Sequence, residues 1–174
     1  MQEIKCSFVI QSGGRNEDRI KVLRSDDHTI VVVADGAGGI SGGAQAAEIV
    51  CARIRSHVVE QGTDWKAALQ ETDRFLLNES FGGESTGVVV EIRAGMIRGA
   101  SVGDSGAWLI TNEETRKLTE YQARKPLLGS GNANPKAFGP IPLRGRLLLV
   151  TDGLFKYVGW NDISCIALQD TLDD

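Results

Sequence analysis

The stretch from residue 29 to residue 39, Thr-Ile-Val-Val-Val-Ala-Asp-Gly-Ala-Gly-Gly, decides the fold of this protein. Residues 29–34 form a continuous apolar run without polar alternation, which predicts a strand buried on both faces. The run ends at Asp35, and glycines are frequent from there to residue 43. Apolar residues then recur at helical spacing, so we expect a helix over residues 47–58 that ends at Gly62.

The segments on either side of this stretch predict an α+β fold. A second helix is expected from residue 64 to residue 76, directly after the first, with no strand between them. The other predicted strands are residues 4–10, 19–23, 86–92, 96–102, 108–111, 116–118, 146–151 and 163–168. Their short links in the middle of the chain favour antiparallel hairpins. Residues 119–142 are predicted to be a long surface loop and residues 154–158 a helical turn, all within one domain, 1–174.

Composition excludes several classes of protein. The chain has 174 residues and a formal net charge of −4, with 21 glycines but only 4 prolines. No apolar run approaches the length of about 20 residues that a membrane span needs. The first residues carry charge where a signal peptide would be apolar, so a cytoplasmic protein is expected. The mild acidity gives no indication of nucleic-acid binding, and we expect a monomer.

Cysteine and histidine are too few and too scattered for the commonest catalytic sites. The three cysteines are widely spaced and match no zinc-binding spacing, which favours buried thiols in a reducing compartment. Only two histidines are present, so a His-based zinc site or a Ser-His-Asp triad is hard to build. Catalysis, if present, must therefore depend on carboxylates and glycines.

One pattern occurs three times. An apolar run ends in a small residue and then an aspartate at Asp35, Asp104 and Asp152. A single aspartate in such a place is most simply a turn residue. Three of them, each at the end of a buried strand, instead favour a metal site, because such a site needs carboxylates held on rigid elements and aimed at one point.

A fourth acidic element, Asn16-Glu17-Asp18, precedes the strand at residues 19–23 and adds two oxygen ligands. Carboxylates without histidine or thiolate neighbours favour the hard cations Mg²⁺ and Mn²⁺ over zinc. Two such ions about 3.5–4 Å apart lower the pKa of a bridging water, which then attacks phosphorus. The pattern therefore predicts a phosphate-ester hydrolase that forms no covalent intermediate.

Two other interpretations of the sequence, one for the glycine-rich segment and one for the whole chain, are weaker. A nucleotide-binding loop would need G-x-G-x-x-G, but Ser41 stands at the last glycine position, and a second helix replaces the parallel strand of a Rossmann unit. A receiver domain with an aspartate pocket would need parallel β/α alternation, which the predicted hairpins contradict. We expect the glycines to let the carbonyl of Gly36 approach a cation closely.

The ordered set of motifs resembles the metal-dependent Ser/Thr protein phosphatases of type 2C, the PPM family, from about residue 7 to residue 168. The motifs that carry the resemblance are Asn16-Glu17-Asp18, Val33-Ala34-Asp35-Gly36-Ala37-Gly38-Gly39, Ser85-Thr86-Gly87, Val102-Gly103-Asp104-Ser105-Gly106-Ala107, Val150-Thr151-Asp152-Gly153-Leu154 and Asp162-Ile163-Ser164. The resemblance implies a four-layer α-β-β-α sandwich of two antiparallel sheets flanked by helices. It also implies a centre of two Mg²⁺ or Mn²⁺ ions, with a possible third.

The family's site residues can be placed on this chain one by one. Asp35 would bridge the two ions and Gly36 would offer its carbonyl to one of them. Asp152 would bind the other ion, and Asp104 would hold a third ion together with Asp152. Glu17 and Asp18 would act through bound waters. The resemblance thus implies that Asp18, Asp35 and Asp152 are catalytic, and that residues 119–142 are the variable flap that contributes to substrate choice.

The chain departs from the family pattern at three places. Arg15, the candidate phosphate-binding residue, lies three residues before Asp18 where the family usually has five. Ala37 stands where many eukaryotic members have a histidine, which favours a bacterial-type member. The segment between Gly153 and the last predicted strand is short, so that either Asn161 or Asp162 would be the last metal ligand.

The sequence therefore predicts a metal-dependent serine/threonine phosphoprotein phosphatase. Its partner would be a phosphorylated protein, and it would oppose a Ser/Thr kinase. The departures near Arg15 and Asn161 support an alternative, a weak or inactive phosphatase-like module that binds a phosphoprotein in a signalling or secretion system.

Overall fold

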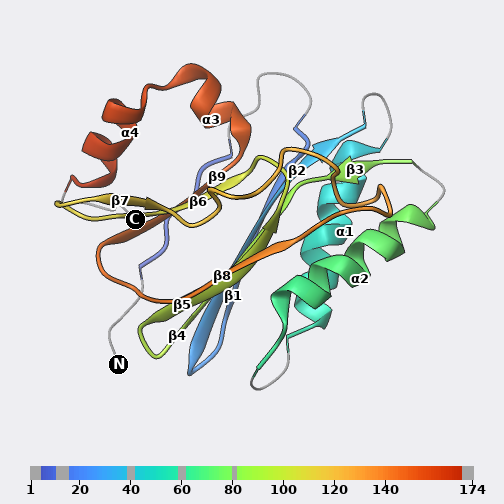
Figure 1. The fold of residues 1–174 in the computed structure, drawn as a ribbon, viewed down its shortest axis with the longest axis horizontal. Helices are drawn as coiled ribbons and strands as arrows, with labels where there is room; N and C mark the ends of the chain where they lie inside the picture. Colours follow the sequence, from blue (N-terminus) through green and yellow to red (C-terminus); the bar gives the residue numbers. More distant parts are fainter. Residues whose placement is uncertain (1–4, 11–15, 39–41, 59–61, 80–81, 170–174) are drawn as a thin grey trace.

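The computed structural model describes residues 5–10, 16–38, 42–58, 62–79 and 82–169, and it contains two antiparallel sheets with helices outside them (Figure 1). The larger sheet has the order β1 (Asp18–Arg24), β2 (His28–Ala37), β4 (Gly87–Arg93), β5 (Met96–Val102) and β8 (Lys136–Pro142), and the short β3 (Glu84–Ser85) also pairs with β2. The smaller sheet has the order β7 (Thr115–Lys117), β6 (Gly106–Ile110) and β9 (Arg146–Val150).

The helices form the two outer layers. Helices α1 (Gly43–Ser56) and α2 (Trp65–Leu77) lie on the larger sheet, whereas α3 (Asp152–Tyr157) and α4 (Trp160–Ala167) lie beside the smaller one (Figure 1). The prediction of a four-layer α-β-β-α sandwich is therefore confirmed. No helix in the described ranges is long and apolar enough to cross a membrane.

Three apolar layers hold the four layers of structure together. The first lies between α1, α2 and the larger sheet, the second lies between the two sheets, and the third lies between the smaller sheet and α3 and α4. Alternation along β6 shows how one strand serves two of them. Leu109 packs between the sheets, whereas Trp108 and Ile110 pack toward α4. Burial on both faces explains why the central strands are continuous apolar runs.

Most predicted elements are confirmed, but three predictions for secondary structure are wrong. Residues 5–10, part of the predicted strand at 4–10, form no strand, and residue 4 lies outside the described residues. The predicted loop at 119–142 contains β8, because Pro140 and Pro142 made this strand resemble a loop in the sequence. Proline is tolerated there, since β8 is the edge strand of its sheet. The predicted strand at 163–168 is instead the main part of α4.

Helix α4 forms because its apolar residues also fit a helical period. Trp160, Ile163 and Ala167 fall on one face and pack onto the smaller sheet. The ring of Trp160 meets that of Trp108 edge to face, with centroids 4.5 Å apart. The aromatic contact adds to the apolar burial that attaches this short helix to the sheet.

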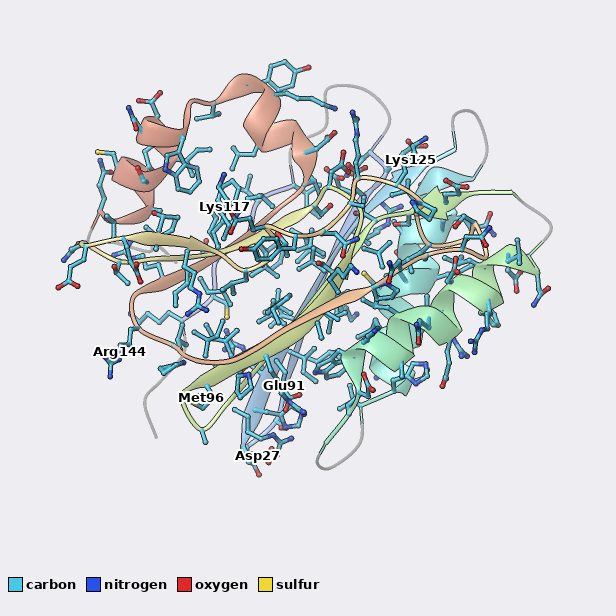
Figure 2. All side chains as sticks on the ribbon, in the orientation of Figure 1. Asp27, Glu91, Met96, Lys117, Lys125 and Arg144 are labelled. Carbon is cyan, nitrogen blue, oxygen red and sulfur yellow. The ribbon has the colours of Figure 1, made fainter. Side chains whose placement is uncertain are left out.

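A buried carboxylate, Glu91 in β4, lies near the β1–β2 hairpin (Figure 2). Its side chain is 2% exposed and accepts hydrogen bonds from Trp65 Nε1 at 2.9 Å, Arg93 Nε at 3.0 Å and Arg98 Nη2 at 2.6 Å. Arg93 also pairs with Asp27. Burial raises the pKa of Glu91, but these hydrogen bonds outweigh it and hold the pKa below its usual value. The group links α2 to the larger sheet.

Candidate active site

Asp18 and Asp35 face each other across β1 and β2, at the end of the sheet opposite Glu91. They are register partners in the antiparallel ladder, so their side chains leave the same face of the sheet. The hydroxyl of Thr151 donates to Asp18 Oδ2 at 3.3 Å. Because Thr151 lies between β9 and α3, this contact joins the end of the smaller sheet to the acidic pair.

Two buried hydroxyl groups hold the backbone beneath the acidic pair. Thr86 Oγ1 accepts a hydrogen bond from the backbone N–H of Asp35 at 2.9 Å, and the Thr86 N–H donates to the Asp35 carbonyl at 2.8 Å. Thr86 Oγ1 also lies 2.6 Å from Ser105 Oγ. Both side chains are almost fully buried. They therefore connect the end of β2 to the turn that carries Asp104.

Asp104 and Asp152 complete the acidic centre, and each of them has a basic partner. Arg124 Nε lies 2.7 Å from Asp104 Oδ2, and Arg124 Nη2 lies 3.9 Å from Asp152 Oδ2. Lys156 Nζ lies 2.7 Å from the same Asp152 oxygen, one helical turn along α3. The hydrogen bond to Asp152 raises the pKa of Lys156.

The electrostatics show an excess of negative charge around Asp35. Burial, followed by the charges of Asp18, Asp152 and Asp104, raises its pKa to about 7. Burial also raises the pKa of Asp18, although the hydrogen bond from Thr151 opposes this effect. In the part of the chain that the structure describes, no lysine or arginine forms an ion pair with Asp18 or Asp35. The charges of Asp18, Asp152 and Asp104 therefore all act on Asp35.

Glu17 and Gly36 lie where the end of β2 meets the start of α1. The Gly36 N–H donates to the Glu17 carbonyl at 3.2 Å. A Cβ on Gly36 would come within 2.1 Å of the Gly43 carbonyl oxygen, and one on Gly43 would come within 2.8 Å of Glu17 Oε1. Glycine at 36 and 43 thus lets α1 begin directly against β2, with the Glu17 carboxylate beside it.

The donor set fits a hard cation in chemistry, since it consists of carboxylate oxygens and one backbone carbonyl. Among the described residues, no three acidic, histidine or cysteine side chains form a ready ligand cluster. Mg²⁺ commonly keeps several waters and binds through one or two carboxylates. The Asp18–Asp35 pair, with its uncompensated charge, meets that requirement.

Three further predicted site residues are not joined to this centre by the described contacts. Arg15 lies outside the described residues, as do residues 39–41 of the glycine-rich segment. Asn161 and Asp162 are exposed in the first turn of α4, rather than before a strand. In the described ranges, neither forms an ion pair or a side-chain hydrogen bond with the aspartates of the centre. Their role as ligands stays a prediction.

A cavity of about 480 Å³ adjoins the acidic centre, with Asp104 on its rim. Trp108 and Trp160 form part of its apolar wall, and Lys117 and Gln122 add polar groups. The cavity lies between the smaller sheet, the segment after β7 and α4. A polypeptide segment bound at Asp104 would therefore have space in this cavity.

The structure adds residues that contact the acidic centre and were not predicted to be site residues. Thr86, Ser105 and Thr151 occur in the motifs quoted above but had no predicted role, and their hydroxyl groups form hydrogen bonds beside the acidic residues. Arg124 is another such residue, because its largely exposed side chain pairs with Asp104. Lys156 had one usable signal, its i,i+4 spacing from Asp152, although the predicted helical turn began only at residue 154.

Comparison with known proteins identifies the family of this chain and agrees with the fold. The family model described as "Protein phosphatase 2C" matches residues 7–166. A search of curated protein sequences returned no match. The fold and the family match define a protein phosphatase. The chain belongs to the protein phosphatase 2C family, whose members are serine/threonine protein phosphatases that depend on metal ions.

Solved bacterial phosphatases have the same fold. The S. agalactiae serine/threonine phosphatase has a TM-score of 0.78 at 21% identity, over 96% of this chain and 86% of that one. Stp1 from Staphylococcus aureus has a TM-score of 0.73 at 20% identity, over 91% and 78%. PstP/Ppp from Mycobacterium tuberculosis has a TM-score of 0.68 at 20% identity, over 88% and 79%. At these identities the likeness concerns the fold alone.

Proposed function

We propose that this protein is a serine/threonine phosphoprotein phosphatase that uses two Mg²⁺ or Mn²⁺ ions, with a possible third. The observation that carries the proposal is that Asp18 and Asp35 are paired across β1 and β2, while Asp152 and Asp104 lie near enough for their charges to help raise the pKa of Asp35 to about 7. A cation would relieve this excess of negative charge. When bound, such ions polarise phosphoryl oxygens and produce a strong nucleophile from water at neutral pH.

The protein's own residues would have distinct tasks in this reaction. Asp35 would bind both ions, Asp152 would bind one, and Asp104 would hold the third. Glu17 and Asp18 would orient bound waters, and the Thr151 hydroxyl would fix the Asp18 carboxylate. Gly36 would offer its carbonyl to one ion, while Asn161 or Asp162 would supply a last ligand and Arg15 would bind phosphate.

The cavity beside Asp104 supports a phosphoprotein rather than a small phosphate ester as substrate. A phosphorylated side chain that reaches the acidic residues leaves the rest of its segment at the surface, next to this cavity. A Ser/Thr kinase that phosphorylates the same protein would be the natural opposing enzyme. We expect the phosphatase to act as a monomer in the cytoplasm.

The test is hydrolysis by protein that has first been stripped with EDTA. We expect no hydrolysis of p-nitrophenyl phosphate without metal, and recovery with Mn²⁺ or Mg²⁺ but not with Ca²⁺. Phosphoserine and phosphothreonine peptides should be cleaved faster than a phosphotyrosine peptide of the same sequence. Calorimetry should count two tightly bound Mn²⁺ ions. Full activity in EDTA would contradict the proposal.

One observation favours a second candidate function, that of a phosphatase-like binding module. Lys156 and Arg124 already neutralise part of the charge on Asp152 and Asp104. The same experiment separates the two functions. A module would bind no Mn²⁺ at millimolar concentration and hydrolyse nothing, but it would still retain a phosphopeptide on a sensor surface.

A further inference from the structure

Two basic side chains from separate elements meet at the acidic centre. Arg124 belongs to the segment between β7 and β8, and Lys156 belongs to α3. Arg124 binds Asp104 at 2.7 Å and approaches Asp152 at 3.9 Å, while Lys156 binds Asp152 at 2.7 Å. Asp152 is therefore shared by both cations.

The two cations lie on the solvent side of the carboxylates. The side chains of Arg124 and Lys156 are 73% and 56% exposed, whereas those of Asp104 and Asp152 are 28% and 21% exposed. A molecule that approaches these two aspartates from solvent would meet the guanidinium and ammonium groups first. The cations are thus placed at the entrance of the centre.

Stability alone gives little reason for this arrangement. Ion pairs with an exposed partner contribute only about 0–1 kcal/mol, because water screens the charges and long side chains lose conformational entropy. The helix fixes one of the cations by geometry, since Lys156 follows Asp152 by four residues and lies over it. Ion pairs that contribute so little can exchange one anionic partner for another at little cost.

A phosphate monoester is the anion that suits this pair. Its oxygens match the planar fork of a guanidinium, and an ammonium adds a compact point charge. A phosphate at the acidic centre must also be shielded from four carboxylates that would repel it. We propose that Arg124 and Lys156 bind the phosphate group of the substrate. The inference rests on the proposed function, whose site it extends to residues on two further elements.

The shared oxygen of Asp152 makes the inference testable through two opposite effects. Lys156 and a divalent cation compete for Asp152 Oδ2, so removal of the lysine should strengthen metal binding. Removal of the same lysine should weaken phosphate binding, because a charge-assisted hydrogen bond is lost. A lysine that merely held Asp152 in position would lower both affinities together when removed.

The experiment measures two affinities by calorimetry, that of Mn²⁺ for the stripped protein and that of inorganic phosphate for the Mn²⁺-loaded protein. We expect R124Q and K156Q each to weaken phosphate binding about 10-fold or more, as loss of a hydrogen bond to a charged group does. K156Q should bind Mn²⁺ several-fold more tightly, and K156R should keep most of the phosphate affinity. R144Q is the matched control, because Arg144 is exposed and lies away from α3 (Figure 2).

Each outcome either supports or overturns the inference. Unchanged phosphate affinity in both variants would overturn it, as would a joint loss of Mn²⁺ and phosphate affinity in K156Q. Failure of the proposed function would look different: the wild-type protein would hydrolyse no phosphopeptide. If that non-hydrolysing protein still bound phosphate in a manner dependent on Arg124 and Lys156, the inference would stand on its own.

Discussion

Asp35 and Glu91 are carboxyl groups on neighbouring strands of one sheet, and their surroundings are opposite. Glu91 is held by an indole N–H and two arginines, and its pKa is lowered. Asp35 has three aspartates around it and no ion pair with a described basic residue, and its pKa rises to about 7. The difference separates a carboxylate that stabilises the fold from one whose charge needs a ligand.

Asp35→Asn should have the largest effect, and it should fall on activity. The substitution removes the carboxylate that would bind both ions, so we expect phosphatase activity to fall by more than about 100-fold, the upper end of the loss for outer-shell partners of metal ligands. Stability should not fall, because like charges no longer repel. Initial rates with p-nitrophenyl phosphate and a urea titration measure the two effects, and a fully active D35N protein would show that the site is misassigned.

Glu91→Gln should give the reverse result. The amide keeps the shape of the side chain but leaves Arg93 and Arg98 without their shared anion. We expect the free energy of unfolding to fall by about 2–3 kcal/mol. The loss should be smaller than for a fully buried ion pair, because the side chains of Arg93 and Arg98 are partly exposed. Activity per folded molecule should stay at the wild-type level. A stable E91Q protein with reduced activity would remove the contrast between the two ends.

The sequence predicted the role of Asp35 but not that of Glu91. A strand-end aspartate such as Asp35 stands out because an apolar run precedes it and glycine follows. Glu91 lies inside a strand, where a glutamate is typical of an exposed face, and its partners are 2, 7 and 26 residues away. A buried carboxylate of this kind becomes visible only when Trp65 and Arg98 are brought to it by the fold.

The same limit explains the errors in secondary structure. The apolar residues of α4 fit both a strand and a helix over so short a segment, and the contact of Trp160 with Trp108 on a distant strand favours the helix. The strand β8 forms because β5 offers a partner, although its prolines indicate a loop. Likewise, the link from Thr86 to Ser105 depends on two turns that meet only in the folded chain.

Asp35 and Glu91 should change the stability of the protein with pH in opposite directions. The pKa of Asp35 is raised from 3.8 to about 7. In protein stripped of divalent ions, the protonated Asp35 therefore contributes fully to the free energy of unfolding below about pH 4, and this contribution is lost as the pH rises through 7. The pKa of Glu91 is lowered from 4.5, so its contribution is present above that value and is lost as the pH falls through its folded pKa. One proton changes stability by at most about 1.4 kcal/mol for each pH unit.

Urea titrations between pH 3.5 and 8 would measure this contrast. The stability of wild type minus that of D35N should decrease as the pH rises, whereas wild type minus E91Q should increase in the acidic range and then level off. Saturating Mn²⁺ should abolish the first trend, because a bound cation favours the charged carboxylates. Parallel slopes for both differences would contradict the assigned electrostatics.

Arg93→Gln should produce the smallest change and would show how the charge on Glu91 is shared. Arg93 is 23% exposed, and Trp65 and Arg98 still bind the glutamate after its removal. We therefore expect a loss of about 0.5–1 kcal/mol, close to the value for exposed ion pairs. The double variant with E91Q supplies the control: if Arg93 acts through Glu91, R93Q should add little in the E91Q background. Full additivity would mean that Arg93 stabilises the hairpin through Asp27 instead.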